Sequence, residues 1–132
     1  MSSTAGVMQL RQGTVERRRA LFEEAKEIIE SEYPKDLELD QVARRLATSR
    51  RQLQRSFAEI GNTSFRSYVA EVRMQRALEL LQAGSMPVRD VASSVGYRQP
   101  AQFAKTFRRH HGAPPSSFRG GSSSENGAHV LQ

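Results

Sequence analysis

The sequence predicts an all-α protein that contains one structural unit twice, a short helix, a turn and a longer helix, with a long central helix between the copies. The first observation is a near-repetition at an offset of 50, in which residues 52–57 (QLQRSF) return as residues 102–107 (QFAKTF). The second is that residues 42–47 (VARRLA) return as residues 91–96 (VASSVG), at an offset of 49. The third is that apolar side chains recur at the three-to-four-residue spacing of helices.

A helix that precedes both units is expected from Thr14 to Tyr33. Its apolar positions share one face, and Pro34 disfavours helical geometry at the residue before it. Residues 1–13 are small and polar without periodicity, so we expect them to be disordered. The exposed face of this first helix is acidic, and we interpret the helix as a support element. The acidic residues are Glu23, Glu24, Glu27 and Glu30.

The first unit is expected to place a short helix from about Leu39 and a second helix from Ser49 to Ile60. Ser49 followed by Gln at the third position after it is typical of a capping box, in which the serine covers free amides of the next helix. Leu53 and Phe57 are one helical turn apart and are expected to face inward.

The central helix is expected at residues 64–83, a length of about 30 Å at 1.5 Å per residue. The second unit is expected to begin at Pro87, and Phe103 and Phe107 repeat the inward pair of the first unit. The predicted boundaries are therefore a disordered segment at residues 1–13, a first subdomain with the central helix at 14–83, a second subdomain at 84–119, and a flexible tail at 120–132.

Charge is distributed unevenly along the chain. Residues 41–119 carry 14 basic and 4 acidic side chains, a net charge of +10, whereas residues 1–40 carry 6 and 9, a net charge of −3. Thirteen of those 14 basic residues are arginine, whose forked guanidinium suits phosphate and guanine. So basic a segment repels itself unless a polyanion neutralises it, which indicates double-stranded DNA as the partner.

The second helix of a helix-turn-helix lies in the major groove, where its outward side chains contact base edges. Arginine suits guanine and glutamine suits adenine. The side chains expected to contact bases, opposite the inward pairs, are Arg50, Arg51, Gln54 and Arg55 in the first unit and Arg98, Gln99, Gln102 and Lys105 in the second. Because the two sets differ, and the central helix can separate them by about one groove repeat of roughly 34 Å, we expect an asymmetric site of about two helical turns.

The same residues resemble the DNA-binding domain of the AraC/XylS family of bacterial transcription regulators, over about residues 37–119. The resemblance implies seven helices in two small three-helix subdomains joined by the central helix, and an activator that contacts RNA polymerase. It also implies phosphate contacts near Ser49, Arg66, Thr106 and Arg109. The motifs that carry it are Leu53-Gln54-Arg55-x-Phe57, Arg73-Met74-x-x-Ala77-x-x-Leu80-Leu81, Val91-Ala92-x-x-Val95-Gly96-Tyr97, and Phe103-x-x-x-Phe107 followed by Gly112, Pro115, Phe118 and Arg119.

The chain departs from that family in two ways. Ala47 stands where members often have glycine, so the first turn is expected to differ slightly in its backbone. Most members also have an N-terminal effector or dimerisation domain, for which residues 1–38 are too few. The chain is therefore either a stand-alone regulator that binds DNA as a monomer, which we favour because it starts with Met, or the DNA-binding piece of a longer regulator.

Other functions are excluded or left open by composition. The absence of cysteine excludes thiolate metal sites and a cysteine nucleophile, and the adjacent histidines at 110–111 complete no familiar metal motif. We expect no metal, no cofactor and no enzyme activity. No apolar run approaches the roughly 20 residues of a membrane span, so a cytoplasmic, nucleoid-associated protein is expected. A sequence-indifferent chromosome-packing protein, and a protein-binding role for the acidic first helix, remain open alternatives.

Overall fold

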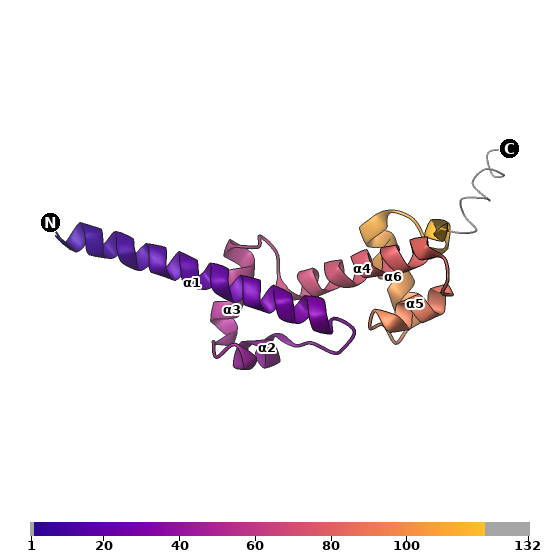
Figure 1. The fold of residues 1–132 in the computed structure, drawn as a ribbon, viewed down its shortest axis with the longest axis horizontal. Helices are drawn as coiled ribbons and strands as arrows, with labels where there is room; N and C mark the ends of the chain where they lie inside the picture. The colour runs from indigo at the N-terminus through magenta and orange to yellow at the C-terminus, as the bar shows by residue number, and fades with distance from the viewer. Residues whose placement is uncertain (1, 121–132) are drawn as a thin grey trace. The chain divides into compact units, whose positions relative to one another are not determined.

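The computed structural model describes the backbone of residues 2–120 and the side chains of residues 13–120. Over that range it contains six α-helices, a final 3-10 helix and no strand (Figure 1). These seven helical elements confirm the predicted all-α fold with two short-helix, turn, longer-helix units. Their bounds are α1 Ser2–Glu32, α2 Leu39–Arg45, α3 Arg50–Glu59, α4 Phe65–Ala83, α5 Val88–Ser94, α6 Pro100–His111 and η1 Pro115–Phe118.

The first helix is longer than the sequence indicated. It begins at Ser2, ahead of the Thr14 start that we expected. Extending a helix that already exists requires only one residue to be ordered for each new hydrogen bond, which is far cheaper than nucleation. The predicted tail at 120–132 lies, apart from Gly120, outside the described residues.

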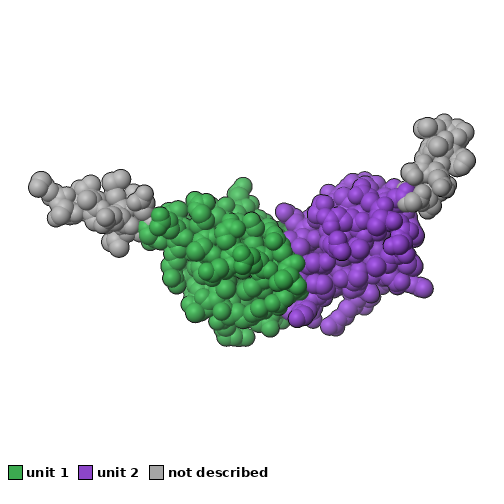
Figure 2. Space-filling view, viewed as in Figure 1, with its two compact units in different colours: residues 1–32, 37–68 green, residues 33–36, 69–132 purple. Residues whose placement is uncertain are grey.

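The chain divides into two compact units (Figure 2). Unit 1 comprises Met1–Glu32 and Leu37–Tyr68, and unit 2 comprises Tyr33–Asp36 and Val69–Gln132. The boundary falls inside α4, whereas the sequence-based division placed the whole central helix in the first subdomain. α4 therefore contributes its first turn to one core and its remaining turns to the other.

The core of unit 1 is built around the fully buried ring of Phe57. The ring of Phe22 from α1 meets it edge-to-face, with centroids 5.1 Å apart, and the ring of Phe65 from α4 does so at 5.6 Å. Edge-to-face pairs are favoured by the ring quadrupoles in addition to the burial of apolar area. The inward pair predicted for α3 is thus confirmed, and α1 supports α3 as expected. The other buried apolar side chains of unit 1 include Leu21, Ala25, Ile29, Val42, Ala43 and Leu53.

The core of unit 2 repeats this arrangement around Phe103 and Phe107, both fully buried. Phe118 of η1 packs edge-to-face on Phe107 with centroids 5.4 Å apart. Met74, which the sequence analysis did not place in the core, is also buried there. The two adjacent histidines diverge: His110 is exposed, while the ring of His111 packs 4.5 Å from that of Phe107.

The short helices α2 and α5 end in the same backbone turn. The amide of Thr48 donates to the carbonyl of Ala43 at 2.9 Å, and the amide of Tyr97 donates to the carbonyl of Ala92 at 2.9 Å. This bond and its neighbour form a Schellman motif, in which the residue after the helix adopts a left-handed conformation. Ala47 holds that position with φ 55° and Gly96 holds it with φ 103°. The first turn therefore differs from the second in the backbone dihedral angle at Ala47, while its hydrogen bonds are the same.

Candidate nucleic-acid interface

The start of α3 is fixed by Ser49. Its hydroxyl accepts a hydrogen bond from the amide of Gln52 at 3.1 Å, which confirms the predicted N-cap. Behind it, the hydroxyl of the buried Ser56 donates to the carbonyl of Gln52 at 2.9 Å. With Leu53 and Phe57 held in the core, the opposite side of α3 is left to solvent.

All four side chains predicted to contact bases from the first unit are exposed. Arg51 and Gln54 make no hydrogen bond or ion pair that the described residues reveal. Arg50 donates to the carboxylate of Asp40 on α2 at 3.2 Å, and the Nε of Arg55 donates to Glu59 at 3.4 Å. Half of this predicted set is therefore free in the structure, and the other half is held by a carboxylate on a neighbouring turn or helix.

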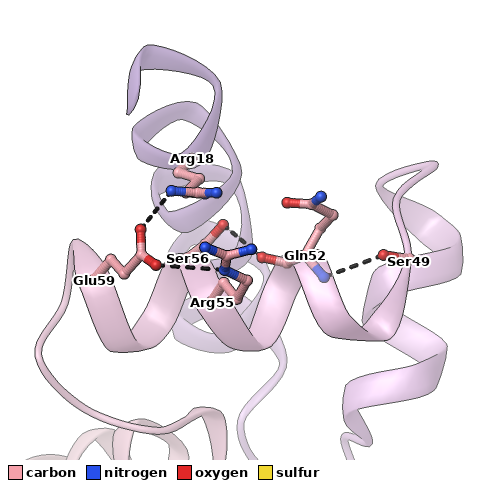
Figure 3. Close-up of polar contacts among 6 residues, drawn as sticks. All are labelled: Arg18, Ser49, Gln52, Arg55, Ser56 and Glu59. Atoms are coloured by element: carbon pink, nitrogen blue, oxygen red, sulfur yellow. Dashed lines mark hydrogen bonds and ion pairs between the residues drawn. The ribbon is translucent and has the colours of Figure 1, made fainter. Parts of the chain in front are cut away.

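Glu59 joins α3 to α1 (Figure 3). One of its carboxylate oxygens accepts from Arg55, and the other accepts from Arg18 of α1 at 2.5 Å. Arg18 is only 14% exposed, so this contact fixes Glu59 from the protein side. Neither Arg18 nor Glu59 was predicted from the sequence to take part in the interface. The four-residue spacing of Arg55 and Glu59 was a usable signal for one contact, but nothing local points to the other.

The predicted set of the second unit contains two charged side chains, whereas that of the first unit contains three. Gln102 and Lys105 on α6 are exposed and have no partner within the described part of the chain. Gln99 is the N-cap residue of α6 without a side-chain capping bond, and Pro100 follows as the first helical residue. Arg98, just before the helix, is highly exposed and donates to Asp36 at 3.2 Å.

The predicted phosphate contacts do not all lie at the surface. Ser49, Arg66 and Arg109 are exposed, as a phosphate contact requires, whereas Thr106 is only 4% exposed. Thr106 lies one helical turn after the buried Phe103, on the inward side of α6, so its hydroxyl has little access to DNA. The spacing from Phe103 could have warned of this.

The described part of the chain contains neither a candidate metal site nor a candidate membrane span. Residues 2–120 bring together no group of three or more His, Cys, Asp or Glu side chains that could hold a metal ion. None of the helices in this range is long and apolar enough to cross a membrane.

Comparison with known proteins decides the family. A family of helix-turn-helix domains matches residues 42–121. A solved transcriptional regulator from Chromobacterium violaceum, described as containing an AraC-type DNA-binding domain, is 30% identical with a TM-score of 0.72, over 76% of this chain and 89% of that one. The chain belongs to the AraC-type helix-turn-helix family. It is a DNA-binding domain of a transcription regulator, and the family consists of regulators rather than enzymes.

Two relatives are named for the operons that they control. The Msm operon regulatory protein of Streptococcus mutans is 33% identical over 101 residues, which are 76% of this chain and 36% of that protein. The lactose operon transcription activator of Staphylococcus xylosus is 29% identical over 98 residues, 74% of this chain and 35% of that protein. The chain thus spans little more than a third of the length of either relative.

Proposed function

We propose that this domain is a sequence-specific activator that binds an asymmetric DNA site of about two helical turns. In this proposal the two reading helices, α3 and α6, enter successive major grooves. Arg51, Gln54 and Arg55 contact bases from α3, and Gln102 and Lys105 contact bases from α6. Arg50, Arg98 and Gln99, at the starts of the two helices, are assigned to bases at the edges of the two half-sites.

The observation that carries the proposal is the two-sided character of each reading helix. One side is buried through a pair of apolar residues, and the other presents arginine, lysine and glutamine to solvent. A chromosome-packing protein needs positive charge but has no use for glutamine on both reading helices, because phosphates can be neutralised by any cation. The exposed glutamines therefore favour base recognition.

The phosphate contacts that we propose are Ser49, Arg66 and Arg109. Helix N-termini and arginines commonly contact phosphates and fix the register of a protein on its site. Thr106 is left out because it is buried.

Selection of binding sites from random duplex DNA, followed by titration at fixed salt, tests sequence specificity. We expect the best selected duplex to bind at least about 10³-fold more tightly than random duplex. A ratio within about tenfold would favour chromosome packing instead. Footprinting should protect about two helical turns, with unlike sequences in the two halves.

Activation is supported by the name of the Staphylococcus xylosus relative and by the family resemblance. In vitro transcription from a promoter that carries the selected site should rise when the protein is added to RNA polymerase. Arg51→Ala should abolish the rise if it depends on the site. If transcription falls, the protein is a repressor at that promoter.

The alternative is that this chain is the DNA-binding portion of a longer, effector-responsive regulator. The proposed DNA interface is the same in that case. This alternative is favoured by the observation that the chain spans only 36% and 35% of the length of the two relatives. Sedimentation of the chain on its selected duplex distinguishes binding as a monomer, at one chain per site, from binding as a dimer.

A further inference from the structure

A hollow in unit 1 lies beside the start of α3 and has no role in the base contacts proposed above. Its volume is about 770 Å³, and it is formed by three separate parts of the unit. α1 supplies Thr14, Arg17 and Arg18; α2 and its turn supply Arg44, Ala47 and Thr48; and the start of α3 supplies Ser49 and Gln52.

The lining of this hollow is cationic. Three of its eight residues are arginines and none is acidic. The charge of Arg18 is partly offset by Glu59, but its Nε is buried without a hydrogen-bond partner among the described residues, so this guanidinium is short of acceptors. Arg17 and Arg44 are exposed, and no ion pair in the described part of the chain involves either of them. Two guanidinium groups are thus available to an anion.

The uncharged part of the lining also suits an anion. Thr48, Ser49 and Gln52 offer hydroxyl and amide groups, and the first amides of α3 point toward its N-terminal end, where the helix dipole favours negative charge. Small-molecule pockets are lined predominantly by hydrophobic and aromatic side chains, whereas seven of the eight residues here are polar or charged and none is aromatic. Half or more of protein–DNA hydrogen bonds, in contrast, go to phosphate and sugar.

We propose that the hollow binds one backbone phosphate of the DNA strand next to the bases contacted by α3, through Arg17 of α1 and Arg44 of α2. The inference rests on the proposed function, because α3 must lie in the major groove for a strand to pass its N-terminus. It gives the middle of α1 a contact with DNA, although that helix was expected from the sequence to act as support alone. The second unit has Ser93 at the position of Arg44 and no counterpart of Arg17, so this contact belongs to one half of the site.

Salt-dependent binding of the selected duplex by Arg17→Ala, Arg44→Ala and the double variant tests the proposal. Arg19→Ala is the matched control, since Arg19 is an exposed arginine of the same helix that does not line the hollow. Each test substitution should weaken binding about tenfold and lower the salt slope by about one. The control should leave both close to wild type. All three positions are exposed, and far-UV circular dichroism checks that the variants remain folded.

Replacing single phosphates of the duplex by methylphosphonates identifies the contact. At one position next to the α3 half-site, the replacement should weaken wild type about tenfold and should leave the double variant unaffected. Calorimetric titration of the protein and its variants with inorganic phosphate tests whether the hollow binds free phosphate rather than a phosphate of DNA. The proposal is overturned if the test variants behave like Arg19→Ala, or if they lose only binding of inorganic phosphate. Failure of the wild type to bind any duplex would instead overturn the proposed function.

Discussion

The turn after α2 and the turn after α5 have the same hydrogen bonds but different residues at the left-handed position. In the first turn Ala47 is exposed, so a methyl group there meets solvent. In the second turn a Cβ on Gly96 would lie 2.9 Å from Cζ of Arg73 and 3.0 Å from the carbonyl oxygen of Pro34. Alanine therefore costs only backbone strain in one turn, whereas the other turn also has no room for it.

The crowding around Gly96 follows from the contacts of Arg73. Its guanidinium donates to the carbonyls of Tyr33 and Lys35 at 2.8 and 2.9 Å and lies over the ring of Tyr97 at 5.5 Å. Unit 2 thereby incorporates the turn at residues 33–36. The two units therefore share a local turn motif, and the surroundings of the motif decide which residue it tolerates.

The outward faces of the two reading helices differ as well. At an offset of 50, Arg55 of α3 corresponds to Lys105 of α6, and Glu59 corresponds to Arg109. Glu59 holds Arg55 in place, whereas Lys105 and Arg109 have no such partner among the described residues. α3 therefore presents a cation that is paired with a carboxylate, and α6 presents cations for which the described residues show no such pair.

The largest effect that would test this comparison is expected for Gly96→Ala. The substitution adds left-handed strain and displaces Arg73, so the free energy of unfolding should fall by about 2–3 kcal/mol in urea titrations. Gly112→Ala is the matched control, because Gly112 has φ 83° but nothing within 4 Å of an added Cβ. It should cost about 1 kcal/mol. Equal losses for the two variants would mean that the crowding at Gly96 has no energetic weight.

Next in size is the difference between Arg55→Ala and Arg109→Ala in DNA binding. Arg55→Ala should cost about 1–3 kcal/mol at the selected site and relax one base position. Arg109→Ala should weaken all sequences alike and lower the salt slope by about one. Titration of both variants on selected and random duplexes measures this. Identical behaviour would remove the distinction between base-contacting and phosphate-contacting residues.

A smaller effect is expected for Glu59→Gln. Without the carboxylate, Arg55 is no longer held and one negative charge near DNA is lost, so affinity for random duplex should rise about threefold while the ratio of selected to random binding falls. Glu71→Gln removes the same charge from an exposed position on α4 and is the control. If the ratio stays at the wild-type value in Glu59→Gln, Glu59 does not position Arg55.

The smallest effect is expected for Ala47→Gly. Relief of left-handed strain is worth about 1–2 kcal/mol, and the greater freedom of glycine in the unfolded chain offsets about 0.4–1 kcal/mol of that. The free energy of unfolding should therefore rise by about 0.5–1 kcal/mol in urea titrations. A fall would show that the first turn is not strained.

Much of the fold could be predicted from local sequence signals. The inward pairs Leu53 with Phe57 and Phe103 with Phe107 and the cap at Ser49 all depend on residues within one or two turns of each other. The same signals could have placed Thr106 inward, since it lies three residues after Phe103.

What only the tertiary structure decided are the contacts between residues distant in sequence. Arg18 and Glu59 are 41 residues apart, and Arg73 and Tyr33 are 40 apart. No periodicity links such residues, because their approach depends on how whole helices pack. For the same reason, the basic hollow beside α3, which joins three segments, could not be found from the sequence.

The sequence by itself therefore determined which apolar pair of each reading helix is buried and which of the opposite side chains are exposed, because helical spacing alone assigns faces. The tertiary structure decided how Arg55 and the turn at Gly96 are held, because packing brings Arg18 to Glu59, the partner of Arg55, and brings Arg73 to that turn. The repeated apolar residues make the two cores alike. Contacts with residues distant in sequence, such as Arg18 and Arg73, make the surfaces of the two units different.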